Sequence, residues 1–228
     1  MPASPARRFL AVLFDFDGTL THPDALNFPA LRSAIGCPPG TLILEYIDAL
    51  PTEEERDVKR KILADFEMAA ARASVPNDGA EEMIHMIRSR GIGIGILTRN
   101  TRVSIMESMK NFRTVTEKDF RVIVTRESQG RPKPHPDGVL DAARQFGVEP
   151  RELLVVGDFV FDIAAGKAAG APTVLLTNGR ATPQAWIPDA SPDALARRAR
   201  IPGTAPLTAP AADYTIGTLA ELAGILGI

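Results

Sequence analysis

A short apolar run that ends abruptly in carboxylates constrains this chain more than any other feature. Residues 10–14 are continuously apolar, and the sequence DFDGT follows at once from Asp15 to Thr19. An apolar run of this length is typical of a strand buried on both faces of a parallel sheet. Ligands of open α/β sheets bind beyond the carboxyl ends of the strands, so Asp15 and Asp17 are expected to face a binding site. A solvated turn is the alternative interpretation, because Asp and Gly dominate turns.

The rest of the chain alternates between helix and strand from residue 77 onward. Further strands are predicted near residues 92–97, 121–125, 153–156 and 172–177, with helical segments between them. A further edge strand is expected near residues 213–216. Repeated β-α units predict a parallel sheet with helices on both faces. The predicted fold class is therefore α/β, a Rossmann-like parallel sheet flanked by helices, with a small helical cap domain.

The cap domain is predicted from residues 23–75, where the strand character disappears. Three helices are expected there, the second capped by Thr41 and the third opened by a capping box of Thr52 and Glu55. The third carries apolar residues at helical spacing, namely Val58, Ile62, Phe66, Ala69 and Ala73. Residues 1–22 and 76–228 form the predicted core domain. Its first helix is expected to start with another capping box, made by Asp78 and Glu81.

Composition narrows the class of protein. The 45% of hydrophobic residues suffices for a core, and the 26 basic and 28 acidic residues nearly balance. That balance provides no broad positive potential for binding nucleic acid or an anionic membrane. Binding through a local basic patch is left as an alternative. No stretch approaches the roughly 20 apolar residues of a membrane span, and a single cysteine, Cys37, suits a reducing cytosol. We expect a cytoplasmic monomer or homodimer, with the proline-rich segment 179–212 running over its surface.

Three more polar groups are expected near the carboxyl ends of strands. Thr98 and Asp158 follow predicted strands, and Lys133 lies in a strand-to-helix loop. A carboxylate such as Asp15 can attack phosphorus, and Asp17 can exchange a proton with the leaving group and then with water. Thr98 and Lys133 suit phosphate oxygens, and the oxygens of Asp15 and Asp158 suit Mg²⁺. Singly, Thr98 and Asp158 also suit helix caps, and Lys133 also suits a solvated loop.

At this point the chain resembles the haloacid dehalogenase-like hydrolase superfamily, and most closely its phosphoglycolate-phosphatase-like branch with a helical cap. The resemblance rests on four stretches of sequence: DFDGTL from Asp15, LTRN from Leu97, KPHP from Lys133 and GDFVFD from Gly157. The first and last are specific, whereas the middle two are weak alone.

The resemblance implies a role for each matching residue. Asp15 is the nucleophile, and Asp17 is the acid/base and a metal ligand through its backbone carbonyl. Thr98 and Lys133 bind the phosphate, while Asp158 completes the Mg²⁺ site. Asp162 is expected to brace Lys133 or to lie behind the metal ligands. Arg99 either contacts the substrate or is exposed at the surface.

The activity expected from the resemblance is a Mg²⁺-dependent phosphatase. It acts on a small phosphorylated metabolite of the phosphoglycolate or sugar-phosphate type, through an aspartyl-phosphate intermediate, with no nucleic acid or membrane partner. A phosphosugar mutase is the alternative, followed by a 2-haloacid dehalogenase or a non-catalytic binding module on the same fold. The short cap interval departs from the branch, and the substrate-facing stretch expected in it is residues 41–46.

Overall fold

The structure is a computed structural model that describes residues 9–39, 41–180 and 211–228. Within these residues one parallel sheet has the strand order β3-β2-β1-β4-β5-β6. The strands are β1 (Ala11–Phe14), β2 (Gly93–Leu97), β3 (Val122–Val124), β4 (Leu153–Gly157), β5 (Thr173–Leu176) and β6 (Tyr214–Ile216). The α/β class with a parallel sheet is confirmed. The expected and the observed ends of each strand differ by at most one residue.

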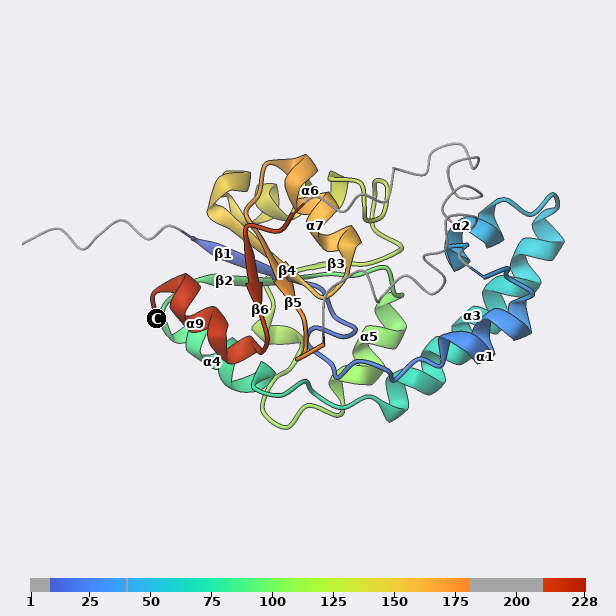
Figure 1. The fold of residues 1–228 in the computed structure, drawn as a ribbon, viewed down its shortest axis with the longest axis horizontal. Coiled ribbons are helices and arrows are strands. Elements are labelled where there is room, and N and C mark those ends of the chain that lie inside the picture. The colour runs from blue at the N-terminus through green and yellow to red at the C-terminus, as the bar shows by residue number, and fades with distance from the viewer. Residues whose placement is uncertain (1–8, 40, 181–210) are drawn as a thin grey trace, which may run out of the picture.

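Helices cover both faces of the sheet (Figure 1). The helices α4 (Ala80–Ser89), α5 (Arg102–Met109) and α9 (Leu222–Leu226) lie on one face, and α6 (Asp137–Phe146) and α7 (Val160–Ala169) lie on the other. Successive side chains of a strand point to opposite faces. Val12 and Phe14 therefore join the first apolar layer, and Ala11 and Leu13 join the second. Short 3-10 turns span Glu117–Asp119, Pro150–Glu152 and Leu219–Glu221.

Two glycines of β2 allow α6 to approach the sheet closely. A Cβ at Gly93 would lie 2.8 Å from Cε1 of Phe146, and a Cβ at Gly95 would lie 3.0 Å from Cζ of the same ring. The aromatic ring therefore occupies the space that two side chains would otherwise fill. This contact explains why a buried strand contains glycines, which weaken strands in general.

The helices α1 (Phe28–Ile35), α2 (Ile43–Asp48) and α3 (Glu53–Ala73) form a separate unit beside the carboxyl ends of the strands (Figure 1). We call residues 23–75 the insertion. Its apolar cluster is distinct from both layers that cover the sheet. The buried members of this cluster are Leu31, Ile35, Cys37, Ile47 and Leu63.

The two connections between the insertion and the sheet are hydrogen-bonded to each other. Thr21 and Pro76 form an isolated antiparallel bridge. The amide of His22 donates to the carbonyl of Val75 at 2.9 Å, and the amide of Asn77 donates to that of Leu20 at 2.9 Å. The chain therefore leaves the sheet and returns to it at one place.

The expected helix starts were right in one case and wrong in two. Thr52 and Glu55 make the predicted capping box of α3. Leu42, not Thr41, precedes α2, and it makes no side-chain cap bond. Gly79, not Asp78, precedes α4, and it makes no side-chain cap bond. Glu81 does not complete the expected capping box, since its carboxylate accepts hydrogen bonds from the amides of residues 113 and 114, at 2.9 and 2.6 Å.

The predicted apolar face of α3 is also wrong in part. Val58 is 55% exposed, and Ala69 and Ala73 are exposed as well. The buried residues of the helix are Leu63, Glu67 and Ala71. An acidic residue therefore lies at the centre of the inner face, where a search for apolar spacing does not find it.

Two remaining expectations concern membrane contact and the proline-rich segment. Across the described ranges, no helix combines the length and the apolar character needed to cross a membrane. Most of the segment 179–212 lies outside the described residues.

Candidate active site

The strand order creates a switch point beside β1. The chain adds β2 and β3 on one side of β1 and then returns to place β4 on the other side. Ligands of open α/β sheets bind at such a point, beyond the carboxyl ends of the strands. Asp15 follows β1 directly and Asp158 follows β4 directly. The fold therefore brings two carboxylates, 143 positions apart in the sequence (158 − 15), to one crevice.

Lys133 lies between two carboxylates. Its Nζ donates to Oδ1 of Asp15 and to Oδ1 of Asp162, at 2.6 Å in each case, and its side chain is 5% exposed. Burial alone would lower the pKa of Lys133, but the charges of both aspartates outweigh burial and raise it. Burial and the charge of Asp15 raise the pKa of Asp162. These two effects oppose ionisation of the Asp162 carboxyl beside Lys133. The two short hydrogen bonds favour the charged lysine.

The carboxylates form a possible cation site. Ligand oxygens of Asp15, Asp158 and Asp162 lie within 4.8 Å of one another. Both oxygens of Asp162 have partners, since Oδ1 accepts from Lys133 and Oδ2 accepts from the amide of Phe159 at 3.0 Å. Within the described ranges, the carboxylate of Asp158 accepts only a weak hydrogen bond, 3.5 Å long, from the Thr19 hydroxyl. Asp15 and Asp158 therefore fit a hard cation such as Mg²⁺ better than Asp162 does.

The electrostatics of Asp158 support this assignment. Burial, together with the charges of Asp15 and Asp162, raises the pKa of Asp158 well above its usual range. Clustered carboxylates repel one another, and a cation relieves that repulsion. Gly18 adopts a φ of +73°, and a Cβ there would overlap the Asp158 carboxylate. The glycine in DFDGTL thus leaves room for the carboxylate that follows β4.

Asp17 faces the open pocket rather than the interior of the sheet. Its side chain is reached by solvent, but the walls of the site surround it. Desolvation there, and next the charge of Asp15, raise the pKa of Asp17 to about 7. The side-chain amide of Asn100 donates to Oδ2 of Asp17. This carboxyl can therefore exchange a proton near neutral pH.

Thr98 follows β2 and is buried. Its hydroxyl accepts a hydrogen bond from the amide of Asn100 at 3.1 Å. The backbone amides at the start of α5 are less available to a phosphate, because two of them already donate to side chains. Thr101 caps the amide of Ser104 at 3.3 Å, and Glu127 accepts from the amide of Arg102 at 3.1 Å.

Arg99 lies inside the site and connects the sheet with the insertion. Its Nη2 donates to Oε1 of Glu45 in α2 at 2.6 Å, and its side chain is only 19% exposed. The guanidinium also lies over the ring of Phe161, 5.2 Å from the centroid. Of the two expectations for Arg99, exposure at the surface is wrong, and substrate contact stays a prediction.

A second ion pair joins the insertion to the sheet domain and was not expected from the sequence. Arg126 donates through Nη2 to Oε1 of Glu67 in α3, and its Nε donates to the carbonyl of Arg99 at 2.8 Å. Glu67 is 5% exposed on its side chain. The sequence could have indicated that Glu67 is buried, because Glu67 lies four residues after Leu63 and four before Ala71, on the inner face of α3. Glu45 lies in the stretch 41–46 that was expected to face the substrate and does line the cavity, but neither its contact with Arg99 nor the position of Asn100 was predicted.

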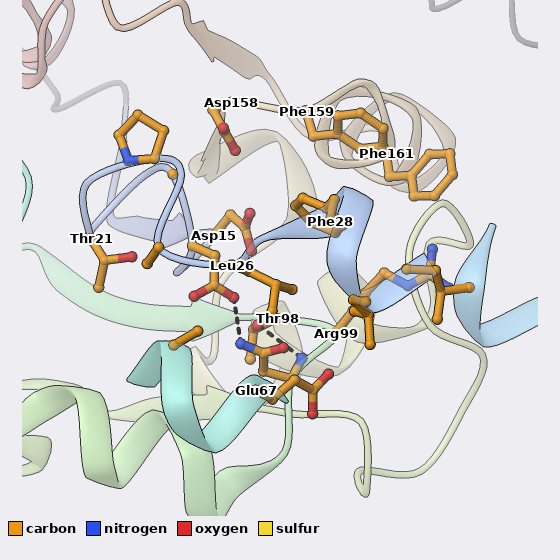
Figure 2. A pocket seen from close by; sticks show the side chains of 18 of the residues that line it. Asp15, Thr21, Leu26, Phe28, Glu67, Thr98, Arg99, Asp158, Phe159 and Phe161 are labelled. Atoms are coloured by element: carbon orange, nitrogen blue, oxygen red, sulfur yellow. Dashed lines mark hydrogen bonds between the residues drawn. The ribbon is translucent and has the colours of Figure 1, made fainter. Parts of the chain in front are cut away.

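One cavity contains all seven predicted site residues. Its volume is about 550 Å³, and it extends from the carboxyl ends of the strands to the insertion. Figure 2 shows Asp15, Asp158 and Thr98 together with Phe28, Phe159, Phe161 and Arg99 around this space. The predicted residues that line it are Asp15, Asp17, Thr98, Arg99, Lys133, Asp158 and Asp162. The structure brings them together, while their chemical roles stay predictions.

Comparison with known proteins gives a consistent family match. The profile of the family described as haloacid dehalogenase-like hydrolase matches residues 12–176. An uncharacterized hydrolase of Saccharomyces cerevisiae is 38% identical over 74% of this chain and 77% of its own length. The N-acetylmuramic acid 6-phosphate phosphatase of Pseudomonas aeruginosa is 30% identical over 78% of this chain and 85% of its own length. The phosphoglycolate phosphatase of Escherichia coli K12 is 29% identical over 65% of this chain, which spans 56% of that enzyme.

Solved structures share the fold at low sequence identity. A hydrolase from Pseudomonas syringae has a TM-score of 0.70 and 22% identity, covering 96% of this chain and 98% of its own. CbbY from Rhodobacter sphaeroides, in complex with phosphate, has a TM-score of 0.64 and 18% identity, covering 96% and 100%. At these identities the likeness concerns the fold.

Proposed function

The chain belongs to the haloacid dehalogenase-like hydrolase family, and from this premise we propose that it is a Mg²⁺-dependent phosphatase acting on a small phosphorylated metabolite. The observation that carries the proposal is the gathering of Asp15, Asp158 and Lys133 at the switch point of the sheet, with Asp17 in the same cavity. Phosphoryl transfer needs a nucleophile, a proton donor and positive charge around the phosphate oxygens, and these residues supply them.

In the first step a carboxylate oxygen of Asp15 attacks phosphorus, and the bond from phosphorus to the ester oxygen breaks. Asp17 gives its proton to the departing oxygen, which leaves as the alcohol. The pKa of about 7 keeps a large fraction of Asp17 protonated at neutral pH. Lys133 holds Asp15 in place, and its charge offsets the negative charge of the transferring group.

In the second step water attacks the aspartyl phosphate. Asp17, now ionised, takes a proton from that water, the bond between phosphorus and Asp15 breaks, and inorganic phosphate leaves. The Thr98 hydroxyl binds a phosphate oxygen in both steps. Asp15, Asp158 and the backbone carbonyl of Asp17 would hold Mg²⁺. When bound, the cation neutralises charge on the phosphate and orients it.

The insertion, residues 23–75, acts as the cap in this proposal. The ion pairs Arg99–Glu45 and Arg126–Glu67 hold its helices over the cavity. A closed cap excludes water other than the attacking molecule and brings its own side chains to the substrate. The sheet domain then supplies the chemistry, and the cap selects the substrate.

Turnover of p-nitrophenyl phosphate with and without Mg²⁺ tests the proposal. We expect metal-dependent hydrolysis by the wild type and at least a thousandfold loss of kcat in Asp15→Asn, because the amide cannot form the intermediate. Asp65→Asn, at an exposed position of α3, is the matched control and keeps wild-type kcat. An unchanged rate in Asp15→Asn would contradict the assignment of the nucleophile.

A panel of phosphate esters then addresses the substrate. Phosphoglycolate and N-acetylmuramic acid 6-phosphate belong in it because they are named in relatives, together with common sugar phosphates. The ester with the highest kcat/KM identifies the class of alcohol that the cap accepts.

A further inference from the structure

We propose that the site prefers a phosphate ester whose alcohol portion is bulky, apolar and uncharged. We propose further that Glu45, paired with Arg99, discriminates against substrates that carry a carboxylate in addition to the phosphate. The inference rests on the proposed phosphatase function and specifies its substrate class. It points away from phosphoglycolate, the two-carbon acid ester that the family resemblance suggested.

The first argument is the size of the cavity. At about 550 Å³ it falls within the range of roughly 300–1,000 Å³ found for pockets that enclose drug-sized ligands. A phosphate, a metal ion and a two-carbon acid would leave much of this space unfilled. The remainder lies toward the insertion, so the alcohol portion of the ester is the part that fills it.

The second argument is the apolar lining of that part. Phe28 of α1 is 51% exposed although it is a large aromatic residue, and it borders the cavity. Phe159 and Phe161 pack edge to face with their centroids 4.9 Å apart, and Figure 2 shows all three rings around the pocket. An apolar ligand covers such surface with a gain in free energy. The aliphatic residues that line the same cavity are Leu26, Leu31, Leu42, Ile43, Leu44 and Leu63.

The third argument is that the arginines of the pocket already have partners. Arg99 contacts Glu45, Arg126 contacts Glu67 and Arg180 contacts Asp24. Arg32 donates through Nη1 to the backbone carbonyls of residues 38 and 41, at 3.1 and 2.6 Å. Three of the four arginines among the described lining residues are therefore held in ion pairs with carboxylates, whereas Arg32 bonds backbone carbonyls and its Nε is buried with no partner among those residues.

The form of the Arg99–Glu45 pair gives it a selective role. One hydrogen bond joins the two side chains, and Arg99 Nε and Glu45 Oε2 are buried with no partner among the described residues. A pair that served only to attach α2 would gain from the two parallel bonds of a bidentate contact. A carboxylate on the substrate would compete with Glu45 for Arg99 and would be repelled by it. A neutral alcohol meets no such repulsion.

Three alkyl phosphates of similar intrinsic reactivity test the preference: ethyl phosphate, 2-phenylethyl phosphate and phosphoglycolate, each with Mg²⁺. For the wild type we expect kcat/KM for 2-phenylethyl phosphate to exceed that for ethyl phosphate by about tenfold or more, as burial of a phenyl group provides. Phosphoglycolate is expected to fall below ethyl phosphate. Phe28→Ala should reduce the first ratio at least threefold, while Val58→Ala, at an exposed position outside the lining, should not change it.

Glu45→Gln tests the charge. It releases Arg99, so we expect the ratio of kcat/KM for phosphoglycolate to that for ethyl phosphate to rise about tenfold, a typical effect of one charge in a partly buried site. Asp48→Asn is the matched control, because Asp48 lies on the same helix but is 70% exposed on its side chain and contacts Arg60. We expect this control to keep the wild-type ratio.

The outcomes separate the two proposals. Wild-type preference for phosphoglycolate, or a Glu45→Gln ratio equal to that of the wild type, would overturn this inference and leave the phosphatase function intact. Failure of the wild type to hydrolyse any ester with Mg²⁺ would overturn both. The binding affinity of Asp15→Asn for 2-phenylethyl phosphate and phosphoglycolate, measured by calorimetry, reports the same preference independently of turnover.

Discussion

At the scale of single residues, the environment of Asp17, the proposed acid/base, differs from that of Asp15, the proposed nucleophile. Asp15 is fixed by Lys133 at 2.6 Å, whereas Asp17 faces the pocket and contacts only the amide of Asn100 among the described residues. The pKa of about 7 therefore belongs to the carboxyl that is free to exchange protons.

The first prediction concerns Asp17→Asn. We expect phosphorylation of Asp15 by ethyl phosphate to slow at least a hundredfold, because a poor leaving group needs the proton. With p-nitrophenyl phosphate the same step should slow by less than tenfold, since nitrophenolate leaves without protonation. Single-turnover kinetics measures both. Mg²⁺ affinity should stay within about threefold of the wild type, and equal losses with the two esters would contradict the role as an acid.

Several of these residues could be located from the sequence, and others could not. Asp15, Thr98 and Asp158 each come directly after an apolar run, so a parallel sheet alone brings them to one edge. Glu45 reaches Arg99 only because the insertion folds back over that edge. The direction of a side chain on a docked helix depends on packing between distant segments, which no local pattern records.

At the scale of elements, the contact between α3 and the sheet domain depends on a buried charge. Glu67 is almost fully buried and relies on Arg126 for its ion pair. Burial raises the pKa of Glu67, and the charge of Arg126 opposes that shift. Removing one partner of a buried ion pair costs about 3–5 kcal/mol, because the other charge is left without compensation.

The second prediction is that Arg126→Met destabilises the protein by about 3 kcal/mol at pH 7.5, measured by urea unfolding. The loss should shrink at pH 5, because the unpaired Glu67 can then become protonated. Arg72→Met is the control: its contact with Glu107 is 3.6 Å long and its side chain is 68% exposed, so it should cost less than about 1 kcal/mol. Equal losses in the two variants would contradict a special role for the buried pair.

The same element shows where local patterns suffice. The capping box of α3 uses neighbours three residues apart, and Thr52 and Glu55 predicted it correctly. The inner face of α3 was predicted from apolar residues only, so Glu67 was missed. Capping is decided within one turn of helix, but the face that a helix buries is decided by its partner.

At the scale of the whole molecule, the crowded carboxylates make stability depend on pH and on metal. Asp17 and Asp158 have pKa values raised in the folded state. A carboxyl of this kind destabilises the fold as pH rises through its folded pKa. The metal-free protein is therefore expected to lose stability between about pH 4 and pH 7, the range set by the usual pKa of Asp and the raised value of Asp17.

Mg²⁺ should act in the opposite direction, and this is the third prediction. The cation binds ionised carboxylates, so its stabilisation grows as pH rises. At a concentration of 100 Kd it is worth about 2.7 kcal/mol, or about 5–10 °C in Tm for a chain of this length. Thermal unfolding should show this shift at pH 7.5, a smaller one at pH 5.5, and none in Asp158→Asn. A shift of equal size at both pH values would argue against carboxylate ligands.

The paired connections at Thr21 and Pro76 have a consequence for how this protein can diversify. Because the chain departs and returns through adjacent hydrogen-bonded residues, a segment of almost any length fits between them without displacing β1 or α4. At such a junction another domain can be inserted, or the existing insertion can be removed. New substrate ranges can arise there by exchange of one segment, while the aspartates of the proposed site are inherited unchanged.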